Sequence, residues 1–535
     1  MESFDFDFII IGSGFGGSVS AHRLTEKGYK VAVLEMGRRW TPENIPESNR
    51  SVSRWLWRPG LGMHGFFSLR FFRHAMVLHG NAVGGGSITY ANTLLVPPEI
   101  VWEHGSWQGL ADWKAEMPRH YATASHMLGV TENKILGPAD RLLKRTAEAV
   151  GAGHTFYPTR VGVFQAPSGE APGKTYADPY FDGEGPERTT CIGCGECMTG
   201  CRHGAKNSLD YNYLYLAEKH GARVFAEHKV TDLKTLGGRA DGSAGYEVFT
   251  GHPSPFSGKN KNRFTARCVV FAASALGSME LLFRLKDKGS LPHLSDQLGK
   301  RVLTNCESLI GVRTPGGQDM SGGVAIGSGI YLGHNTHIEA TRYGKGSDVI
   351  GLISTLLITG RPGPTRPFQL MYQLLRSFVK NPAKTLRLLR LKHWAEESII
   401  LLCMQALKGH LEMRWQRTWY WPFSKRLVTR GDKIPAFIPE ANAFAQKMAQ
   451  ISGGAPMSSI TEVLFNIPAT AHILGGCGMG NTPEEGVVDA QNRVFGYANM
   501  YVCDGSVFAA NLGVNPSLSI AAMTERAMEG VSPKS

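Results

Sequence analysis

The chain has 535 residues, of which 42% are hydrophobic, and a formal net charge of +12. A chain of this length and composition is globular and can bury a large core. Its nine cysteines are an odd number, and four share one short run, which excludes an ordinary disulfide framework and favours a reducing compartment. No stretch approaches the roughly 20 apolar residues that cross a bilayer, and no signal peptide is recognisable. We therefore expect a cytoplasmic protein.

The positive charge is concentrated in one segment. Residues 361–395 contain no acid and eight basic residues, which alternate with Leu, Phe and Tyr. These basic residues are Arg361, Arg366, Arg376, Lys380, Lys384, Arg387, Arg390 and Lys392. A charge confined to one amphipathic stretch favours a membrane surface over nucleic acid as the partner. We expect no nucleic-acid binding and peripheral contact with the inner face of a membrane; a subunit interface or a lid with a solvated basic face are the alternatives.

The N-terminal residues follow the order strand, glycine turn, helix, strand. An apolar strand at 6–11 leads into Gly12-Ser13-Gly14-Phe15-Gly16-Gly17, a helix near 18–25 and a second strand that ends at Glu35. In such a unit the three glycines permit a tight turn, the approach of a pyrophosphate and close helix–strand packing. The phosphates lie at the helix N-terminus, and Glu35 is placed to accept hydrogen bonds from a ribose. The unit predicts an ADP-containing cofactor but does not separate NAD from FAD; the alternative is a glycine turn without a ligand.

The remaining elements predict a divided α/β chain. β-like runs occur at 223–225 and 268–272, and the second passes into a helix near Ala275. Residues 311–465 combine alternating stretches, such as 350–358, with amphipathic helical patterns, and the chain ends in a helix at about 517–529. We predict a Rossmann-like FAD-binding domain built from residues 1–45, 76–95, 205–310 and 466–535. Residues 46–75, 96–204 and 311–465 would form an inserted α+β substrate-binding domain with lid loops.

Several separated motifs resemble those of the glucose-methanol-choline (GMC) oxidoreductases. Gly84-Gly85-Gly86-Ser87 resembles the family's second FAD-contacting turn, and Val230 resembles the residue beside the adenine. Asp504-Gly505 and Asn515-Pro516 lie in a segment similar to the C-terminal signature. The resemblance implies that FAD is the cofactor. It implies as FAD contacts Gly12, Gly14, Phe15, Gly16, Gly17, Glu35, Gly84, Gly85, Gly86, Ser87, Val230, Asp504, Gly505, Asn515 and Pro516.

Within this family the active-site residues resemble those of the cholesterol oxidases. His472 looks like the histidine that faces the flavin and the steroid oxygen, although Ala471 replaces an aromatic residue before it. Asn515 looks like the asparagine that completes the pair, and Glu339 like the base for double-bond migration. The resemblance implies oxidation of a sterol 3β-hydroxyl to a ketone, with Δ5 to Δ4 isomerisation. The electrons would pass to O2 or to a redox carrier.

The chemistry of these side chains agrees with those roles. Removing hydride from a secondary alcohol requires a partner for the hydroxyl proton, and histidine suits this near neutral pH. Moving the double bond requires a carboxylate that takes and returns a proton, and burial raises its pKa for that task. The alternatives are a structural histidine at a glycine turn for His472 and a solvated acid at a strand end for Glu339. Asp348, nine residues beyond Glu339, is the next acid to consider.

A run of four cysteines is the other notable motif. Cys191, Cys194, Cys197 and Cys201 have the spacing of a bacterial ferredoxin run, but Arg202 stands where a proline normally follows. An iron–sulfur cluster, a structural zinc and a metal-free thiol loop all remain open, and we favour no metal. Two rival functions stay open. One is a 3-oxo-Δ5-steroid isomerase with redox-silent FAD, and the other is a non-catalytic electron-transfer protein that carries a flavin and, in the cysteine run, an iron–sulfur cluster.

Overall fold

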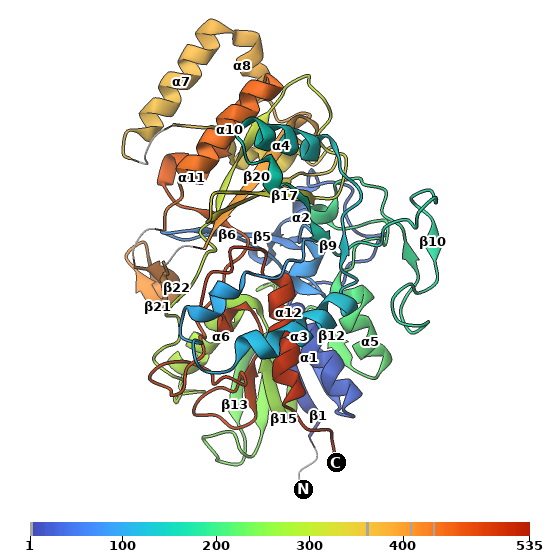
Figure 1. Cartoon of the computed structure of the whole chain (residues 1–535). Helices are drawn as coiled ribbons and strands as arrows, with labels where there is room; N and C mark the ends of the chain where they lie inside the picture. The colour runs from blue at the N-terminus through green and yellow to red at the C-terminus, as the bar shows by residue number, and fades with distance from the viewer. Residues whose placement is uncertain (1–3, 360–362, 407–408, 432–433) are drawn as a thin grey trace.

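The protein is described by a computed structural model that covers residues 4–359, 363–406, 409–431 and 434–535 (Figure 1). Arg361 lies outside these ranges. Two large sheets occupy opposite ends of the molecule, and both termini lie at the end that carries β1 (Phe6–Ile11). Segments that are far apart in sequence build each sheet, as an inserted domain requires.

The first sheet is mixed and has seven strands. Its order is β12 (Arg223–Phe225), β2 (Val31–Leu34), β1, β15 (Arg263–Phe271), β14 (Tyr246–Gly251) and β13 (Lys229–Thr235), and β25 (Met500–Val502) also pairs with β15. The strands β12, β2, β1, β15 and β25 are parallel, whereas β14 and β13 are antiparallel additions. The parallel strands bring their carboxyl ends to one edge, which is where open α/β sheets bind ligands.

Helices cover both faces of this sheet because its central strands are apolar throughout. Phe8 and Ile10 of β1 pack with Ala21 and Leu24 of α1 (Phe15–Glu26), while Ile9 and Ile11 point into the larger core on the other face. A parallel strand that is buried on both sides shows this pattern. The helices around the sheet are α1, α3 (Trp113–Met127), α5 (Tyr213–Lys219), α6 (Ser274–Asp287) and α12 (Ser517–Glu529).

The second sheet is antiparallel and also has seven strands. Its order is β19 (Ser354–Leu356), β23 (Ala455–Ser459), β16 (Ser308–Arg313), β20 (Ser398–Gln405), β18 (Thr336–Thr341), β17 (Ile326–Leu332) and β8 (Tyr157–Pro158). Helices α4 (Pro138–Ala149) and α10 (Pro439–Ser452) cover one face. Leu401 and Cys403 of β20 point into the core under these helices, whereas Ile400 and Leu402 line a cavity on the opposite face. Strand alternation thus gives one sheet a core face and a cavity face.

The elements agree in part with the expected ones. The strand at 223–225 and the final helix at 517–529 occur as predicted. The alternating stretch 350–358 is extended only in part: its first four residues belong to a 3-10 helix, η7 (Asp348–Ile353), and Ser354–Leu356 form β19. The packing of Trp394 against Gly351 overrides the local pattern there. The domain boundaries stay a prediction, although the first sheet draws its strands only from 6–34, 223–271 and 500–502.

Smaller elements connect the two sheets. A three-stranded sheet of β5 (Phe67–Phe71), β6 (Met76–Gly80) and β24 (Ala469–Thr470) lies between them. The others include α2 (Val52–Trp55), β3 (Trp57–Arg58), β4 (Met63–His64), β7 (Thr131–Glu132), β9 (Arg160–Val161), β10 (Thr175–Tyr176), β11 (Arg188–Thr189), α9 (Trp394–Glu397) and α11 (Ile460–Phe465).

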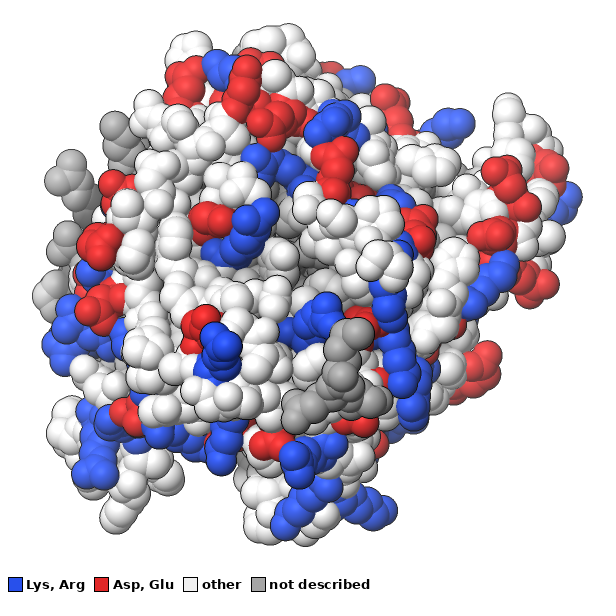
Figure 2. Space-filling model, turned by 90° about the horizontal axis from the view of Figure 1, so that it is seen from below, with Lys and Arg blue, Asp and Glu red and all other residues white. Residues whose placement is uncertain are grey.

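Two projections carry exposed apolar side chains. One is the helix pair α7 (Arg366–Lys380) and α8 (Pro382–Leu389), at the top of Figure 1, and the other is the hairpin of β21 (Glu412–Thr418) and β22 (Trp421–Arg430), at its left. Within the described ranges no helix is both long and apolar enough to cross a bilayer. Seen from below, basic and acidic side chains are interspersed (Figure 2), in contrast to the acid-free α7 and α8.

Candidate active site

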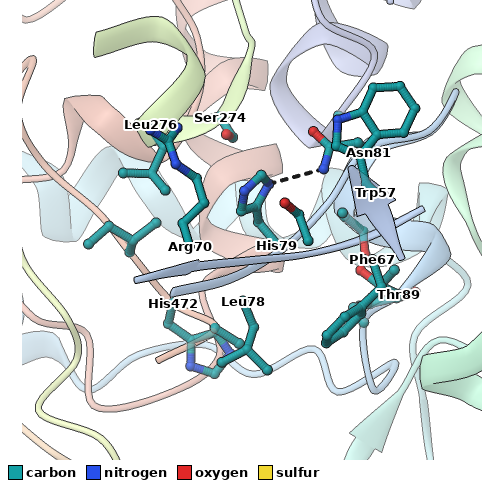
Figure 3. Close-up of a pocket in the computed structure, with 18 of the residues that line it drawn as sticks. Trp57, Phe67, Arg70, Leu78, His79, Asn81, Thr89, Ser274, Leu276 and His472 are labelled. Carbon is teal, nitrogen blue, oxygen red and sulfur yellow. Dashed lines mark hydrogen bonds between the residues drawn. The ribbon is translucent and has the colours of Figure 1, made fainter. Parts of the chain in front are cut away.

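A cavity of about 850 Å³ extends between the two sheets. Its lower wall carries the glycine turn after β1, and its upper wall carries Leu309, Ile400 and Leu402 of the second sheet. Side chains of the small central sheet, including Leu78 and His79 of β6, project into the same space together with His472 (Figure 3). The volume is in the range of small-molecule and cofactor sites.

The glycine turn after β1 forms one end of this cavity. Gly12, Gly14, Phe15 and Gly16 line it, and Gly14 caps α1. A Cβ placed on Gly14 would meet no atom within 4 Å, so the residue borders open space at the helix N-terminus. Free N–H groups and the helix dipole favour a negatively charged group there.

Gly16 and Gly17 of the same turn are in close contact with neighbouring backbone. A Cβ on Gly17 would approach the carbonyl oxygen of Gly12 to 2.0 Å, and one on Gly16 would approach that of Cys503 to 1.5 Å. Gly17 does not line the cavity, in agreement with its predicted role in helix–strand packing.

The second glycine turn packs on the first. Gly85, in the left-handed region with φ +55, would place a Cβ 2.5 Å from the Cα of Gly14, and Gly86 borders open space. Gly85 and Gly86 line the cavity, whereas Gly84 and Ser87 do not. Ser87 donates to the carbonyl oxygen of Gly84 and accepts from the N–H of Leu209. These two hydrogen bonds hold the turn, and a cofactor contact of Ser87 stays a prediction.

Glu35 lies in the cavity wall but already has protein partners. One of its oxygens accepts hydrogen bonds from the N–H and hydroxyl of Ser13, at 3.0 and 2.8 Å, and the other accepts from the N–H of Gly37 at 2.7 Å. Burial raises the pKa of Glu35, and these hydrogen bonds counteract it. Val230, Asp504, Gly505, Asn515 and Pro516 also line the cavity.

His472 forms a close pair with a carboxylate that the sequence did not reveal. His472 follows β24, and Glu307 immediately precedes β16; both side chains line the cavity. Nδ1 of His472 lies 2.5 Å from Oε1 of Glu307, whose other oxygen accepts the N–H of Ala471 at 3.0 Å. Burial lowers the pKa of His472, but the charge and hydrogen bond of Glu307 outweigh it, so the pKa ends above its ordinary value.

Asn515 and Glu339 form a second pair beside the first. Glu339 is fully buried on β18, and its Oε2 accepts a hydrogen bond from Nδ2 of Asn515 at 3.1 Å. It shares a strand face with Thr341, which lines the cavity, as does Asn515, but Glu339 itself does not line it. Burial raises the pKa of Glu339 to about 7. The alternative reading of Glu339 as a solvated acid at a strand end is therefore wrong.

Asp348 does not belong to this site. It accepts hydrogen bonds from the guanidinium of Arg50 and from the N–H of Ala395, and it does not line the cavity. The nine-residue spacing from Glu339 carries Asp348 past β18 and into η7, so the two acids face different surroundings.

The comparisons with known proteins agree with this site. Residues 425–524 match the GMC oxidoreductase family model, and residues 10–78 match an NAD(P)-binding Rossmann-like domain. The chain is 58% identical to a cholesterol oxidase of Acinetobacter baumannii over all of its length and 96% of that protein. It is 45% identical to a cholesterol oxidase of Mycobacterium tuberculosis over 98% of its length and 90% of that protein.

The chain belongs to the GMC oxidoreductase family and is cholesterol oxidase-like. The fold agrees: pyridoxine 4-oxidase from Mesorbium loti superposes with a TM-score of 0.61 over 98% of both chains, at 15% sequence identity. The predicted Rossmann-like α/β fold and GMC membership are confirmed.

FAD is the cofactor of this family and therefore of this enzyme. The residues present fit it, because Gly14 and Gly86 leave open space where side chains would otherwise stand. Glu35 and Val230 lie in the cavity wall with the first glycine turn, while Asp504 and Asn515 lie in it with His472.

Proposed function

We propose that this enzyme oxidises the 3β-hydroxyl of a sterol to the 3-ketone. The observation that carries the proposal is the His472–Glu307 pair, which lines the same cavity as the two glycine turns of the cofactor site. The apolar upper wall of Leu309, Ile400 and Leu402 suits a fused-ring hydrocarbon. The names of the two cholesterol oxidase relatives support the same substrate class.

The protein residues supply the proton transfer and the positioning. FAD, when bound, supplies the acceptor for the hydride that leaves C3 of the alcohol. Glu307 holds Nδ1 of His472, which leaves Nε2 to accept the hydroxyl proton, and its negative charge stabilises the imidazolium that forms. Asn515 presents its amide at the cavity wall, where it contributes a polar group beside the reacting carbon.

We further propose that Glu339 carries the proton in a Δ5 to Δ4 isomerisation. With a pKa of about 7, Glu339 is partly ionised near neutral pH and can both remove a proton α to the ketone and return it. Glu339 is hydrogen-bonded to Asn515 and does not line the cavity, so this step requires Glu339 to gain access to the ketone.

Anaerobic mixing with a 3β-hydroxy-Δ5 sterol tests both steps. We expect the visible flavin bands to bleach and the enone absorbance of the conjugated ketone to follow. Enone formation from a 3-oxo-Δ5 steroid without bleaching by the alcohol would favour the isomerase with redox-silent FAD. Failure of both reactions would refute the sterol assignment. The same reaction with and without air tests the electron acceptor. O2 is the acceptor if admitting air restores the flavin bands without any added redox carrier.

We also propose that α7 and α8 rest on an anionic membrane surface. Phe368, Met371, Tyr372, Leu375 and Val379 follow helical spacing along α7, and all are exposed, Val379 to 82%. An apolar helix face turned to solvent needs a cover.

The basic residues of α7 and α8 and of the segment that follows differ in their exposure and in their ion pairs, which the sequence did not indicate. Arg366 is buried at the start of α7 and pairs with Glu462, and Arg390 pairs with Glu397 at 2.9 Å. Arg376, Lys380 and Arg387 are exposed. These three charges complement anionic headgroups, at about 1 kcal/mol each near such a surface.

Vesicle flotation tests the membrane proposal. Binding to vesicles that contain anionic lipid should weaken when Arg376, Lys380 and Arg387 are changed to Glu, and when Leu375 and Val379 are changed to Ser. The wild type should also bind less at high salt, because exposed charges are screened. Binding that none of these changes affects would refute this role of α7 and α8. A wild-type dimer that both sets of changes convert to monomers would identify a subunit interface instead.

A further inference from the structure

We propose that Cys191, Cys194, Cys197 and Cys201 hold an iron–sulfur cluster beside the flavin site. All four are free cysteines, and all four line one small pocket with Lys206 and Gly323. Fold and spacing therefore bring the whole run to one place, unlike a two-cluster ferredoxin, whose fourth cysteine serves another cluster.

The loop around the cysteines has the backbone that such a site needs. Gly193, Gly195 and Gly200 adopt positive φ values of 68°, 74° and 91°, so the chain winds tightly between the cysteines. A Cβ on Gly195 would lie 2.3 Å from the carbonyl oxygen of Ser321. The N–H of Gly193 donates a hydrogen bond to the sulfur of Cys191 at 3.4 Å. Hydrogen bonds to the sulfurs are one of the means by which proteins adjust such clusters.

Buried positive charge beside the thiols is the second, independent observation. Lys206 and Arg188 are exposed by only 2% and 1%. Lys206 donates to the carbonyl oxygens of Ile88 and Cys197, and Arg188 to those of Gly204 and Lys206. Within the described ranges neither forms an ion pair with a carboxylate. A buried cation is costly without an anion. The buried carboxyl of Asp210 acts on both cations, and a cluster bound by four thiolates would add further negative charge beside them.

The sulfurs of the four cysteines are not gathered closely enough for a single zinc ion. Four thiolates on one zinc lie about 3.8 Å apart, as a tetrahedron with Zn–S bonds of about 2.3 Å requires. Among the described residues, no three of these cysteines bring their sulfurs within 4.8 Å of one another; only Cys194, Glu196 and His203 bring their ligand atoms that close. Glu196 already pairs with Arg202, which competes with a metal ion there. The free pocket is only about 10 Å³, so the partly exposed Cys194 and Cys201 must swing outward around a cluster.

The position of the loop gives the cluster a function. Cys197 begins a 3-10 turn, η5 (Cys197–Thr199), that packs on the second glycine turn, η2 (Gly85–Ile88). Met198 of the same turn lines the main cavity, and Lys206 links Cys197 to Ile88. One turn of protein thus separates the cysteines from the flavin site.

We infer that the cluster is an electron exit. Oxidation of one alcohol releases two electrons, which two successive one-electron transfers through the cluster would deliver to an external one-electron carrier protein. This electron-exit role rests on the proposed sterol oxidation, whereas the cluster itself does not.

The cluster is tested first by composition. Holoenzyme purified without air, or reconstituted with iron and sulfide, should contain about four iron and four acid-labile sulfide per chain. It should absorb broadly beyond the flavin bands. Cys197→Ser and Cys194→Ser should lose at least half of this iron and keep the flavin, whereas Cys268→Ala, a buried cysteine on β15, should keep both. Stoichiometric zinc, or an iron content below one per chain after reconstitution, would overturn the proposal.

The electron-exit role is tested by paramagnetic resonance. Dithionite should reduce the cluster and produce its signal whether or not the sterol is a substrate. Anaerobic sterol should produce the same signal in the wild type. A dithionite signal with flavin bleaching by sterol but no sterol-induced signal would overturn the electron-exit role and leave a structural cluster. A dithionite signal without bleaching by sterol would instead show that the proposed sterol oxidation is wrong.

Discussion

Replacing Glu307 by Gln tests the role of the carboxylate beside His472. The change keeps the size of the side chain and removes its charge. When His472 takes the hydroxyl proton, it becomes positive next to Glu307, with Nδ1 only 2.5 Å from the carboxylate oxygen. If the two delocalised charges are centred about 4 Å apart, an effective dielectric constant of about 20 gives an attraction of about 4 kcal/mol. Such a loss corresponds to a rate about 10³-fold lower.

The assay is stopped-flow bleaching of the flavin by a 3β-hydroxysterol without oxygen. The Glu307→Gln enzyme should keep its flavin and bleach about 10³-fold more slowly, while Glu339→Gln, which alters a neighbouring buried acid, should bleach at close to the wild-type rate. A decrease of less than tenfold in Glu307→Gln would refute the role of Glu307 as the partner of His472.

The pH profile gives a second readout that a merely structural residue would not move. The neutral form of His472 accepts the proton, and its pKa lies above the ordinary value of 6.5. Bleaching by the wild type should therefore decline as the pH falls through a value above 6.5. In Glu307→Gln the attraction of Glu307 is gone, while burial and the attraction of Glu339 remain, so the decline should move to lower pH. An unmoved decline would contradict the assignment.

Three further outcomes follow from the structure. Gly14→Val should fold yet purify without flavin, because its side chain would enter open space at the helix N-terminus, while the exposed Gly258→Val should keep its colour; a yellow Gly14→Val would contradict the cofactor site. Glu339→Gln should nearly abolish enone formation, and in the wild type this step should slow as the pH falls below about 7, where Glu339 becomes protonated; a pH-independent isomerisation would exclude it. Asp140→Ala should lower the free energy of unfolding by about 3–5 kcal/mol, because it leaves the fully buried Arg342 without its 2.6 Å partner; denaturant unfolding measures this, and a loss under 1 kcal/mol would count against a buried ionic pair.

Local order along the chain determined the cofactor-binding unit. β1, its glycine turn, α1 and β2 are consecutive, so their spacing alone placed Gly14 at the helix N-terminus and Gly17 against the strand. His472 and Asn515 could also be named before the structure, because the short segments that carry them resemble those of the GMC family. Interactions within a few residues decide such features, and they are therefore visible in the sequence.

Only the tertiary structure brought the acid–base groups together. Glu307 lies 165 residues before His472 in the chain and has no motif around it, so no sequence pattern could pair them. No sequence pattern could pair Glu339 with Asn515 either. Nor could it show that Arg366 is buried, because the segment around Arg366 contains only basic charges. The sequence by itself determined which residue types were available. Which of them share a low-dielectric cavity depends on how two sheets from distant segments pack, because burial and non-local contact, not local propensity, set their charge and their partners.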